Sequence, residues 1–593
     1  MSRSLNEVVS GTLFLSGNEA VARGAWESGV HFAAAYPGTP STEILEAVGK
    51  HYAEIDAQWA PNEKVGMETI AGASFAGARV LTAMKHVGLN VAADPLFTLS
   101  YIGATGGIVV VSADDPGMHS SQNEQDNRLM AKASKVAMLE PSDSQEAKDM
   151  VGEALSISER FDTPVLLRLT TRISHSKSLV DVGPREEVEV KGYQADIRKR
   201  VPIPAHARLM HSRVEKRLLE LSEFGAAYAY NRIEEGDSSL GIITSGVSYQ
   251  YAKEVYPEAS ILKLGLTNPL PWDLIERFIS GVDEVRFVEE GDPFLEEQVR
   301  ARFLVDAQGK SRVPLEGELN PETVREAIRP DTVRQPPFEK VKTPLRPPAL
   351  CPGCPHRGAF YALSKLSGSS TGDIGCYTLG LMPPHNALET TICMGAAIGV
   401  LSGIEKAVGR EGMGNLVAAI GESTFVHSGI TGLVDMAYNG STGTVMIMDN
   451  SMTAMTGGQE NPTTGKNLRG EPAPKLDLEA LCLACGAKAV RVVDPHDLEE
   501  MEKVLREEME REELSVVITR RPCIMTYRPS RPAYAELDAD QCVGCRICMN
   551  LGCPAISFED DLPSIDPMLC WPNCDLCVQV CPTGALSKDM EGI

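Results

Sequence analysis

The sequence has no long apolar segment. Of its 593 residues, 43% are hydrophobic, yet no uninterrupted apolar run approaches the roughly 18 to 20 residues that a membrane-spanning helix requires. The N-terminal stretch has no basic segment followed by a long apolar one, so no signal peptide is predicted. We therefore expect a cytoplasmic protein that binds no membrane.

Positive charge is also scarce. The chain has 56 Lys and Arg against 81 Asp and Glu, a formal net charge of −25. Binding to phosphate backbones needs clustered basic residues, so this composition argues against a nucleic-acid partner. The chain does have 15 cysteines. Without a predicted secretion signal, they point to metal or redox chemistry rather than to disulfides.

The length exceeds what one hydrophobic core can organise, so we expect three to five domains. Apolar β-branched runs alternate with amphipathic segments and Gly-rich turns, which predicts α/β domains with parallel sheets. The expected strands lie within 106–117, 163–172, 240–246, 283–291, 415–423 and 443–450. The expected organisation is an α/β domain over 1–190, a linker with one helix over 191–235, an α/β domain over 236–330, a Pro-rich linker over 331–349, an α/β domain over 350–527 and a cysteine-rich domain over 528–593.

Two cysteine runs near the C-terminus resemble the two-cluster bacterial ferredoxin pattern. Each run, 542–554 and 570–582, has four cysteines and ends in Cys-Pro. In that pattern the fourth cysteine of each run binds the other cluster. Two spacings are one residue longer than the pattern, and a zinc site is the alternative. The pattern predicts one [4Fe–4S] cluster on Cys542, Cys545, Cys548 and Cys581, and another on Cys553, Cys570, Cys574 and Cys577.

Polar residues also follow two expected strands that are neighbours along the chain. Gly-Glu-Ser ends the first strand and Asp449-Asn450 ends the second. The ends of adjacent parallel strands meet at one sheet edge, where carboxylate and carboxamide oxygens suit Mg²⁺ together with a diphosphate. This resembles the thiamine diphosphate motif, with Glu422 in place of the usual Asp. The resemblance assigns Mg²⁺ to Glu422, Asn450 and the carbonyl of Met452; two ordinary loop ends are the alternative.

Longer motifs extend the resemblance over essentially the whole chain. The chain is similar to the large subunits of indolepyruvate:ferredoxin oxidoreductases, in the 2-oxoacid:ferredoxin oxidoreductase superfamily. The motifs that carry this similarity are YPGTPSTEI (36–44), NEKVGMETIAGASFAGA (62–78), MKHVGLNVAADP (84–95), DDPGMHSSQNEQDNR (114–128), CPGCPHR (351–357), GDIGCYTLG (372–380) and the two cysteine runs.

The resemblance implies a fold and an activity. It implies two α/β domains that bind thiamine diphosphate, the pyrimidine-binding domain first, with a transketolase-C-like α/β domain between them and a C-terminal two-cluster ferredoxin domain. The implied reaction is oxidative decarboxylation of an arylpyruvate with CoA to arylacetyl-CoA and CO₂, with ferredoxin reduced. A small β subunit is the implied partner, in an α₂β₂ assembly. The alternatives are a nonoxidative decarboxylase with an ancillary electron-transfer domain, and a noncatalytic electron-transfer protein.

The resemblance also assigns residues in the first domain. Glu63 matches the glutamate that activates the cofactor, and the alternative is an exposed acid at a helix N-terminus. Thr39 matches a threonine near the 2-oxoacid, and the alternative is an N-cap of a helix that begins at Pro40.

Several residues after the strand-like segment VLTAM are candidates for contact with the substrate. Lys85, His86 and Asn90 could face the carboxylate or carbonyl of a 2-oxoacid. His119 and Arg128 are weaker candidates, because a lone histidine or arginine more often has a structural role.

A third cluster is implied close to the thiazolium ring, where it would remove electrons one at a time. The resemblance assigns this proximal [4Fe–4S] cluster to Cys351, Cys354, Cys376 and Cys523. A redox disulfide or a plain two-cysteine loop is the alternative for Cys351 and Cys354.

The remaining assignments complete the cofactor site. Cys393 has no assigned partner, and Cys482 and Cys485 are interpreted as core residues at the apolar end of a helix. The resemblance assigns cofactor contacts, besides Glu63, to Gly375, Cys376, Met394, Gly395, Gly421, Glu422, Ser423, Asn450, Met452 and Thr453.

Overall fold

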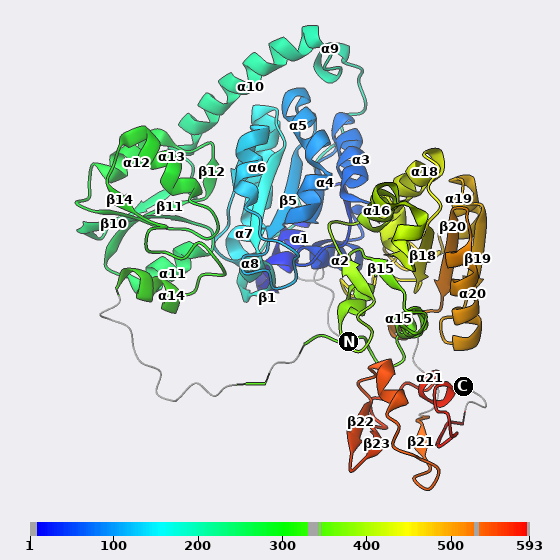
Figure 1. Ribbon diagram of the computed structural model, residues 1–593. Helices are drawn as coiled ribbons and strands as arrows, with labels where there is room; N and C mark the ends of the chain where they lie inside the picture. Colours follow the sequence, from blue (N-terminus) through cyan, green and yellow to red (C-terminus); the bar gives the residue numbers. More distant parts are fainter. Residues whose placement is uncertain (1–8, 330–342, 345–346, 527–532, 590–593) are drawn as a thin grey trace. The chain divides into compact units, whose positions relative to one another are not determined.

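The computed structural model describes residues 9–329, 343–344, 347–526 and 533–589 (Figure 1). The chain divides into two compact units, Met1–Lys340 and Val341–Ile593. The expected linker over 331–349 and the first residues of the expected cysteine-rich domain fall largely outside the described residues. In the described part, no helix is both long enough and apolar enough to cross a bilayer.

The first unit contains a seven-stranded sheet in the order β12-β6-β7-β5-β4-β2-β3. All neighbouring strands are parallel except β12, which runs antiparallel to β6. β5 and β7 are buried along their whole length, which explains why they read as continuous apolar runs. The strands are β2 (Phe32–Ala35), β3 (Asp56–Trp59), β4 (Val80–Lys85), β5 (Ile108–Asp114), β6 (Ala137–Leu139), β7 (Val165–Thr170) and β12 (Leu266–Asn268).

Helices cover this sheet closely. α3 and α5 contribute to the core under β4 and β5, whereas α1 packs against α7 (Figure 1). A Cβ atom at Gly24 of α1 would lie 2.2 Å from the carbonyl oxygen of Lys148 in α7, so this contact requires glycine. These helices are α1 (Gly17–Glu27), α3 (Glu63–Phe75), α5 (Ala93–Ile102) and α7 (Ser144–Phe161).

A second sheet of the same unit has five strands in the order β14-β13-β10-β11-β9. The expected strands over 240–246 and 283–291 correspond to β10 and β13. The expected boundary at 236 is not sharp, because β12 comes from this part of the chain and joins the first sheet. The strands are β9 (Arg232–Glu234), β10 (Asp237–Ser245), β11 (Ala259–Leu264), β13 (Val285–Val288) and β14 (Ala307–Gln308).

The segment expected to be a linker with one helix carries two, α9 (Ile197–Arg200) and α10 (Pro204–Gly225). α10 packs on the first sheet's helices rather than connecting domains freely. Arg217 of α10 is buried and donates to the carbonyl oxygens of Ser100 at 2.7 Å and Asp162 at 2.8 Å.

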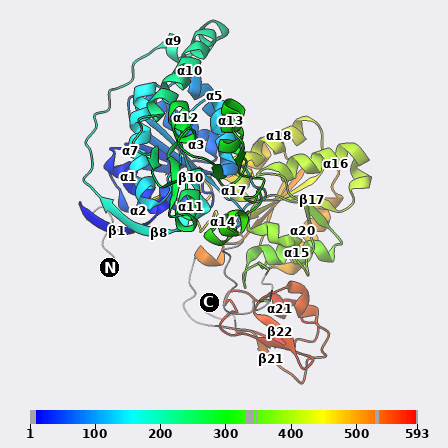
Figure 2. The same ribbon diagram turned by 90° about the vertical axis from the view of Figure 1, so that its left-hand side faces the viewer.

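The second unit contains a six-stranded parallel sheet in the order β16-β15-β17-β18-β20-β19. Successive residues of its strands point to opposite faces, and the core divides accordingly. Val417 and Ala419 face α15 and α20, whereas Ala418 and Ile420 face α16 and α18 (Figure 2). The elements are β15 (Ser369–Thr371), β16 (Leu388–Thr390), β17 (Leu416–Gly421), β18 (Thr444–Asp449), β19 (Ala489–Val493), β20 (Ser515–Arg520), α15 (Pro355–Lys365), α16 (Ala396–Met413), α18 (Ile430–Tyr438) and α20 (Leu498–Glu510).

The cysteine-rich end of the second unit has little regular structure. β21 (Glu536–Leu537) pairs with β24 (Leu586–Ser587), and β22 (Ile556–Glu559) pairs with β23 (Leu562–Ile565), both antiparallel. The small core here is built partly from cysteines, among them Cys548. Segments with so few apolar residues generally need a metal or another crosslink for stability. With these observations the α/β class expected from the sequence is confirmed.

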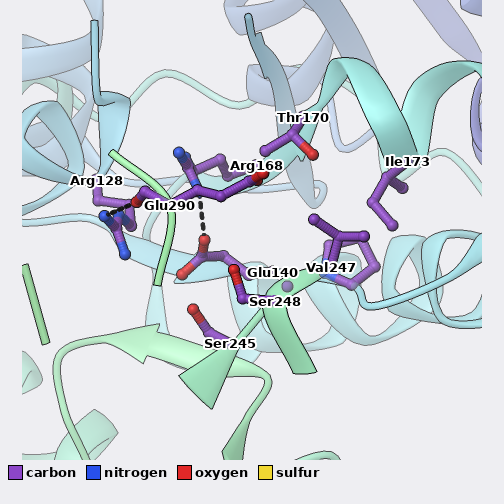
Figure 3. A pocket seen from close by; sticks show the side chains of 11 residues that line it. Arg128, Glu140, Arg168, Thr170, Ile173, Ser245, Val247, Ser248 and Glu290 are labelled. Atoms are coloured by element: carbon purple, nitrogen blue, oxygen red, sulfur yellow. Dashed lines mark hydrogen bonds and ion pairs between the residues drawn. The ribbon is translucent and has the colours of Figure 1, made fainter. Parts of the chain in front are cut away.

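A buried cluster of ion pairs joins the two sheets of the first unit (Figure 3). Arg168 of β7 donates to Asp114 at 2.7 Å and to Glu140 at 2.6 Å. Arg128 donates to Glu289 at 2.7 Å. The carboxylate of Glu290 accepts from the backbone N–H of Leu319 at 2.9 Å. Burial is the main reason that the pKa of Glu290 rises from 4.5 to about 7.

We expect Glu290→Gln to remove a pH-dependent loss of stability. The pKa of Glu290 is higher in the folded chain than in the unfolded chain, so the protonated carboxyl group contributes to the stability of the folded chain at low pH. This contribution is lost as the pH rises from about 4.5 to about 7. Above that range, the ionised carboxylate lowers the free energy of unfolding by about 3 kcal/mol. The variant should therefore melt higher than the parent at pH 8 and similarly at pH 5.

The measurement is the melting temperature of the first unit's transition at several pH values. Glu316→Gln is the control, because Glu316 is exposed. A difference in melting temperature between Glu290→Gln and the parent that stays the same at every pH would contradict the expectation.

Candidate functional site

Glu63 is the first residue of α3 and is buried, with 5% of its surface exposed. The side chain of Asn62 caps the helix by accepting from the N–H of Val65 at 2.9 Å. A Cβ atom at Gly88 would lie 2.5 Å from Oε1 of Glu63. The carboxyl group of Glu63 therefore lies against α4 (His86–Val91), and its interpretation as an exposed helix-terminal acid is wrong.

Thr39 lies in a turn next to the end of β4. A Cβ atom at Gly38 would lie 3.0 Å from Cβ of Lys85, so the turn and Lys85 are neighbours. Helix α2 (Thr42–His51) begins at Thr42 with Ser41 as its N-cap. The helix does not begin at Pro40, so the interpretation of Thr39 as an N-cap is wrong.

Lys85, His86 and Asn90 all hydrogen-bond to the loop that follows β5. The Nζ of Lys85 donates to the carbonyl of Ser120 at 2.7 Å, and burial lowers the pKa of this lysine. His86 lies 3.2 Å from the carbonyl oxygen of Asn123, and its Nδ1 has no partner in the structure. Burial and then the charge of Lys85 lower the pKa of His86, which favours a neutral ring.

The two weaker candidates lie elsewhere. His119 is exposed and sits 3.5 Å from Glu318. Arg128 is buried in the ion-pair cluster of Figure 3, where its guanidinium binds Asp126, Glu289 and the carbonyls of Glu290 and Asp292. The donors of its guanidinium are used within the protein, so Arg128 has a structural role. The prediction that Arg128 contacts the substrate is wrong.

The two polar strand ends in the second unit lie side by side, as expected. β17 and β18 are parallel neighbours, with Gly421 opposite Met448. Glu422 follows β17 and is almost fully buried. Its carboxylate accepts from the N–H of Met452 at 3.1 Å and from the N–H of Asn450 at 3.4 Å. Asn461, which sequence reasoning missed, donates to the same carboxylate at 3.2 Å.

The donor set fits a bound Mg²⁺. The side-chain oxygen of Asn450 is buried and has no partner, next to the carboxylate of Glu422. Burial and then Asp449 raise the pKa of Glu422 to about 8, and a bound divalent cation would reverse this effect. Asp449 itself pairs with Arg520 at 2.8 Å. In the described part of the chain, no three His, Cys, Asp or Glu side chains form a metal site by themselves; the expected ligand set contains only Glu422 of these types.

Further polar groups surround Glu422 and Asn450. The hydroxyl of Thr453 donates to that of Ser423 at 2.9 Å, and the backbone N–H of Thr453 donates to the carbonyl of Gln459 at 3.0 Å. A Cβ atom at Gly421 would lie 2.6 Å from the ring of Tyr377. Tyr377 is in the same short helix as Cys376, so the Gly375–Cys376 segment lies beside the strand end.

Met394 and Gly395 lie at the N-terminus of α16. Gly395 has a φ of +90°, and a Cβ atom there would lie 2.6 Å from Cβ of Ser428, so the position requires glycine. Asp373, also missed from the sequence, accepts from the N–H of Ile374 at 2.7 Å and of Ala397 at 3.3 Å. Burial raises the pKa of Asp373 to about 7.

The four cysteines assigned to the proximal cluster influence one another electrostatically although they are distant in sequence, but no three of these four described cysteines are placed as a ready-made metal site. The pKa of Cys354 rises to about 12, mainly through burial and in part through nearby Cys376 and Cys351. Burial, then Cys523 and Cys351, raise the pKa of Cys376 to about 11. Thiols that resist ionisation to this extent need a metal centre to become thiolate ligands.

This cysteine group adjoins Glu422 and Asn450. The N–H of Cys523 donates to the carbonyl of Asn450 at 2.9 Å, and Glu422 also raises the pKa of Cys376. His356, two residues after Cys354, lies 3.2 Å from the side-chain nitrogen of Asn450. Burial lowers the pKa of His356 to about 4, so its ring is neutral.

The C-terminal cysteines line two separate cavities, four to each. We call the first the cluster I site and the second the cluster II site. Each set combines cysteines from both runs, as the crossed ferredoxin pattern requires. The cluster I site has Cys542, Cys545, Cys548 and Cys581, and the cluster II site has Cys553, Cys570, Cys574 and Cys577.

The cluster II site is packed against the segment that carries the proximal cysteines. Arg357 is buried and donates to the carbonyls of Leu551 and Leu350, both at 2.5 Å. A Cβ atom at Gly353 would lie 2.6 Å from Cβ of Trp571. The cluster II cavity is lined by Gly353, Arg357 and Trp571, among others. No pattern in the sequence predicted this contact between the two segments.

The three other cysteines lie outside these groups. Cys482 is fully buried in α19 (Leu478–Ala484), and Cys485 packs against the same core. The interpretation as a core residue is confirmed for Cys482, whereas Cys485 is only partly buried at the edge of this core. Cys393 is exposed.

Two protein-family models match the chain. "Pyruvate flavodoxin/ferredoxin oxidoreductase, thiamine diP-bdg" matches residues 23–215. "Thiamine pyrophosphate enzyme, C-terminal TPP binding domain" matches residues 373–519. A solved structure, a 2-oxoglutarate:ferredoxin oxidoreductase from Magnetococcus marinus, is 20% identical with a TM-score of 0.44, covering 50% of this chain and 61% of that chain. That likeness is too weak to bear on function.

Curated relatives match over nearly the full length. Indolepyruvate oxidoreductase subunit IorA of Archaeoglobus fulgidus is 39% identical over 98% of this chain and 99% of its own. The subunit of the same name from Pyrococcus horikoshii is 41% identical over 98% of this chain and 97% of its own. The resemblance drawn from the sequence motifs is thereby confirmed, and the chain belongs to the indolepyruvate oxidoreductase subunit IorA family, within the 2-oxoacid:ferredoxin oxidoreductase superfamily.

Proposed function

We propose that the chain is the large subunit of an arylpyruvate:ferredoxin oxidoreductase that acts on indolepyruvate and related 2-oxoacids. The reaction converts an arylpyruvate, CoA and two oxidised ferredoxins to arylacetyl-CoA, CO₂, two reduced ferredoxins and a proton. The observation that carries the proposal is the cysteine group that adjoins Glu422 and Asn450. A nonoxidative decarboxylase needs no electron acceptor next to its cofactor, so this arrangement favours the oxidative reaction.

The residues of the second unit would hold the cofactor. Bound thiamine diphosphate would supply the electron sink for decarboxylation. Glu422, Asn450 and the carbonyl of Met452 would bind Mg²⁺, and Ser423 and Thr453 would lie close to the diphosphate. The buried, unpartnered oxygen of Asn450 supports this assignment.

Residues of the first unit would act on the cofactor and the substrate. Buried Glu63 would hold the cofactor's pyrimidine in its reactive form. The ammonium group of Lys85 suits the carboxylate of a 2-oxoacid, and Thr39 lies in the adjoining turn. His86, with a neutral ring next to Lys85, would hydrogen-bond to the substrate carbonyl.

Electrons would leave through the second unit. The contact between the Gly353 segment and Trp571 supports a transfer from the proximal cysteines to the cluster II site. The cluster I site has the exposed Cys545, which suits it to pass electrons to a separate ferredoxin. A small β subunit in an α₂β₂ assembly and a cytoplasmic location complete the proposal.

We expect Glu63→Gln to lower the rate of decarboxylation at least about 100-fold, as loss of a proton-transfer group commonly does. The measurement is CO₂ release from indolepyruvate by the complete enzyme. Glu68→Gln, on an exposed face of the same helix, should leave the rate unchanged. Retained turnover in Glu63→Gln with normal iron content would remove Glu63 from this role.

We expect Asn450→Ala to weaken Mg²⁺-dependent binding of thiamine diphosphate by about 10- to 100-fold, because the site loses a ligand oxygen. Calorimetric titration with the cofactor at fixed Mg²⁺ measures the affinity. Asn439→Ala is the control, since Asn439 is an exposed helix-terminal residue whose side chain bonds only to Asp435. Equal affinity in the two variants would place Mg²⁺ elsewhere.

We expect about 12 irons per chain in anaerobically purified protein, corresponding to three [4Fe–4S] clusters. Cys523→Ser should reduce this to about 8, because it removes one proximal ligand. Cys485→Ser should keep the parent content, since Cys485 packs against the core. Iron and acid-labile sulfide analysis gives the counts, and about 8 irons in the parent would mean that the proximal site holds no cluster.

A further inference from the structure

Lys588 lies at the cluster II site, and no part of the function proposed above uses it. Its Nζ is 3.4 Å from Sγ of Cys570 and donates to the carbonyls of Trp571 at 2.7 Å and Cys574 at 2.8 Å. An ammonium group has three protons, and these three acceptors use all of them. The charge is therefore fixed at one place beside the cluster ligands.

The backbone around Lys588 holds it there. Strand β24 ends at Ser587, and its Leu586 pairs with Leu537 of β21. Ala585 and Leu586 are buried in the small core. Lys588 follows directly, so its position is set by the strand pair and not only by its own hydrogen bonds.

Lys588 lies beside the whole ligand set. Its Nζ contacts the sulfur of Cys570 and the carbonyl of Cys574. Cys553 and Cys577 line the same small cavity as these two cysteines.

The cluster I site is different. Arg546 lines this cavity, but its guanidinium lies 4.3 Å from the ring centre of Phe558 and 3.3 Å from Asp561. The carboxylate of Asp561 is paired with Arg546, whereas the three hydrogen bonds of Lys588 go to two neutral carbonyls and a cysteine sulfur.

We propose that Lys588 raises the reduction potential of the cluster at the cluster II site above that of the cluster at the cluster I site. Each [4Fe–4S] cluster gains one electron on reduction, with no bond formed or broken, and the electron comes from oxidation of the 2-oxoacid. A fixed cation and an N–H···S hydrogen bond stabilise the added negative charge. The inference rests on the proposed function, because it assumes that both sites hold clusters.

The test is a redox titration of the full chain with its partner subunit, followed by electron paramagnetic resonance. The expected effect of Lys588→Met is measured at the midpoint potential of the parent. There it should lower the ratio of reduced to oxidised cluster roughly tenfold for one C-terminal cluster. This corresponds to a midpoint potential that is 59 mV lower for a one-electron couple. Lys588→Arg should retain most of the parent's potential because it keeps the charge. The exposed Lys503→Met is the control.

Assignment of the signal uses Cys570→Ser, which should alter the same signal that Lys588→Met shifts. If Lys588→Met loses iron, Lys588→Gln replaces it, since glutamine keeps a donor but not the charge. An unchanged midpoint in a variant with full iron content would overturn the inference. An absence of iron in the parent chain would instead overturn the proposed function.

Discussion

The end of strand β18 is the point on which the site of the second unit depends. Asn450 makes several contacts there. Its N–H donates to Glu422, its carbonyl accepts from Cys523, and its side-chain nitrogen lies beside His356. The Glu422 carboxylate and two cysteine-bearing segments are therefore held by one residue. A parallel sheet makes this possible, because its strand ends meet at one edge.

Burial is offset to different degrees in the two units. In the first, buried Arg168 pairs with Asp114 and Glu140, and buried Arg128 pairs with Asp126 and Glu289. In the second, no arginine ion pair is found for Glu422 among the described residues, and burial raises the pKa values of Glu422, Cys354 and Cys376. Metal ions bound there would supply positive charge.

The sequence predicted well what depends on local pattern. Buried strands such as β5 and β18 follow from continuous apolar runs, and the polar strand ends follow from them. Family motifs located Glu63 and the cysteine sets. Long-range packing was not predictable: β12 joins the first sheet from a distant segment, and Arg128 enters a buried ion cluster. Neither the pairing of β12 nor the ion pairs of Arg128 leave a pattern in the sequence. Lys588 and Arg357 were missed because only the folded chain brings them to the cluster II site.

The small cysteine-rich region shows how one set of contacts can serve both stability and electron transfer. Its core is too small to stabilise it alone, so the same cysteines that would bind clusters also complete the packing. Arg357 and Trp571 join this core to the proximal segment. If both sites bind clusters, the distance between them is set by packed side chains rather than by a flexible connection. A substitution in this junction would then alter both the packing of the region and the proposed route of the electrons.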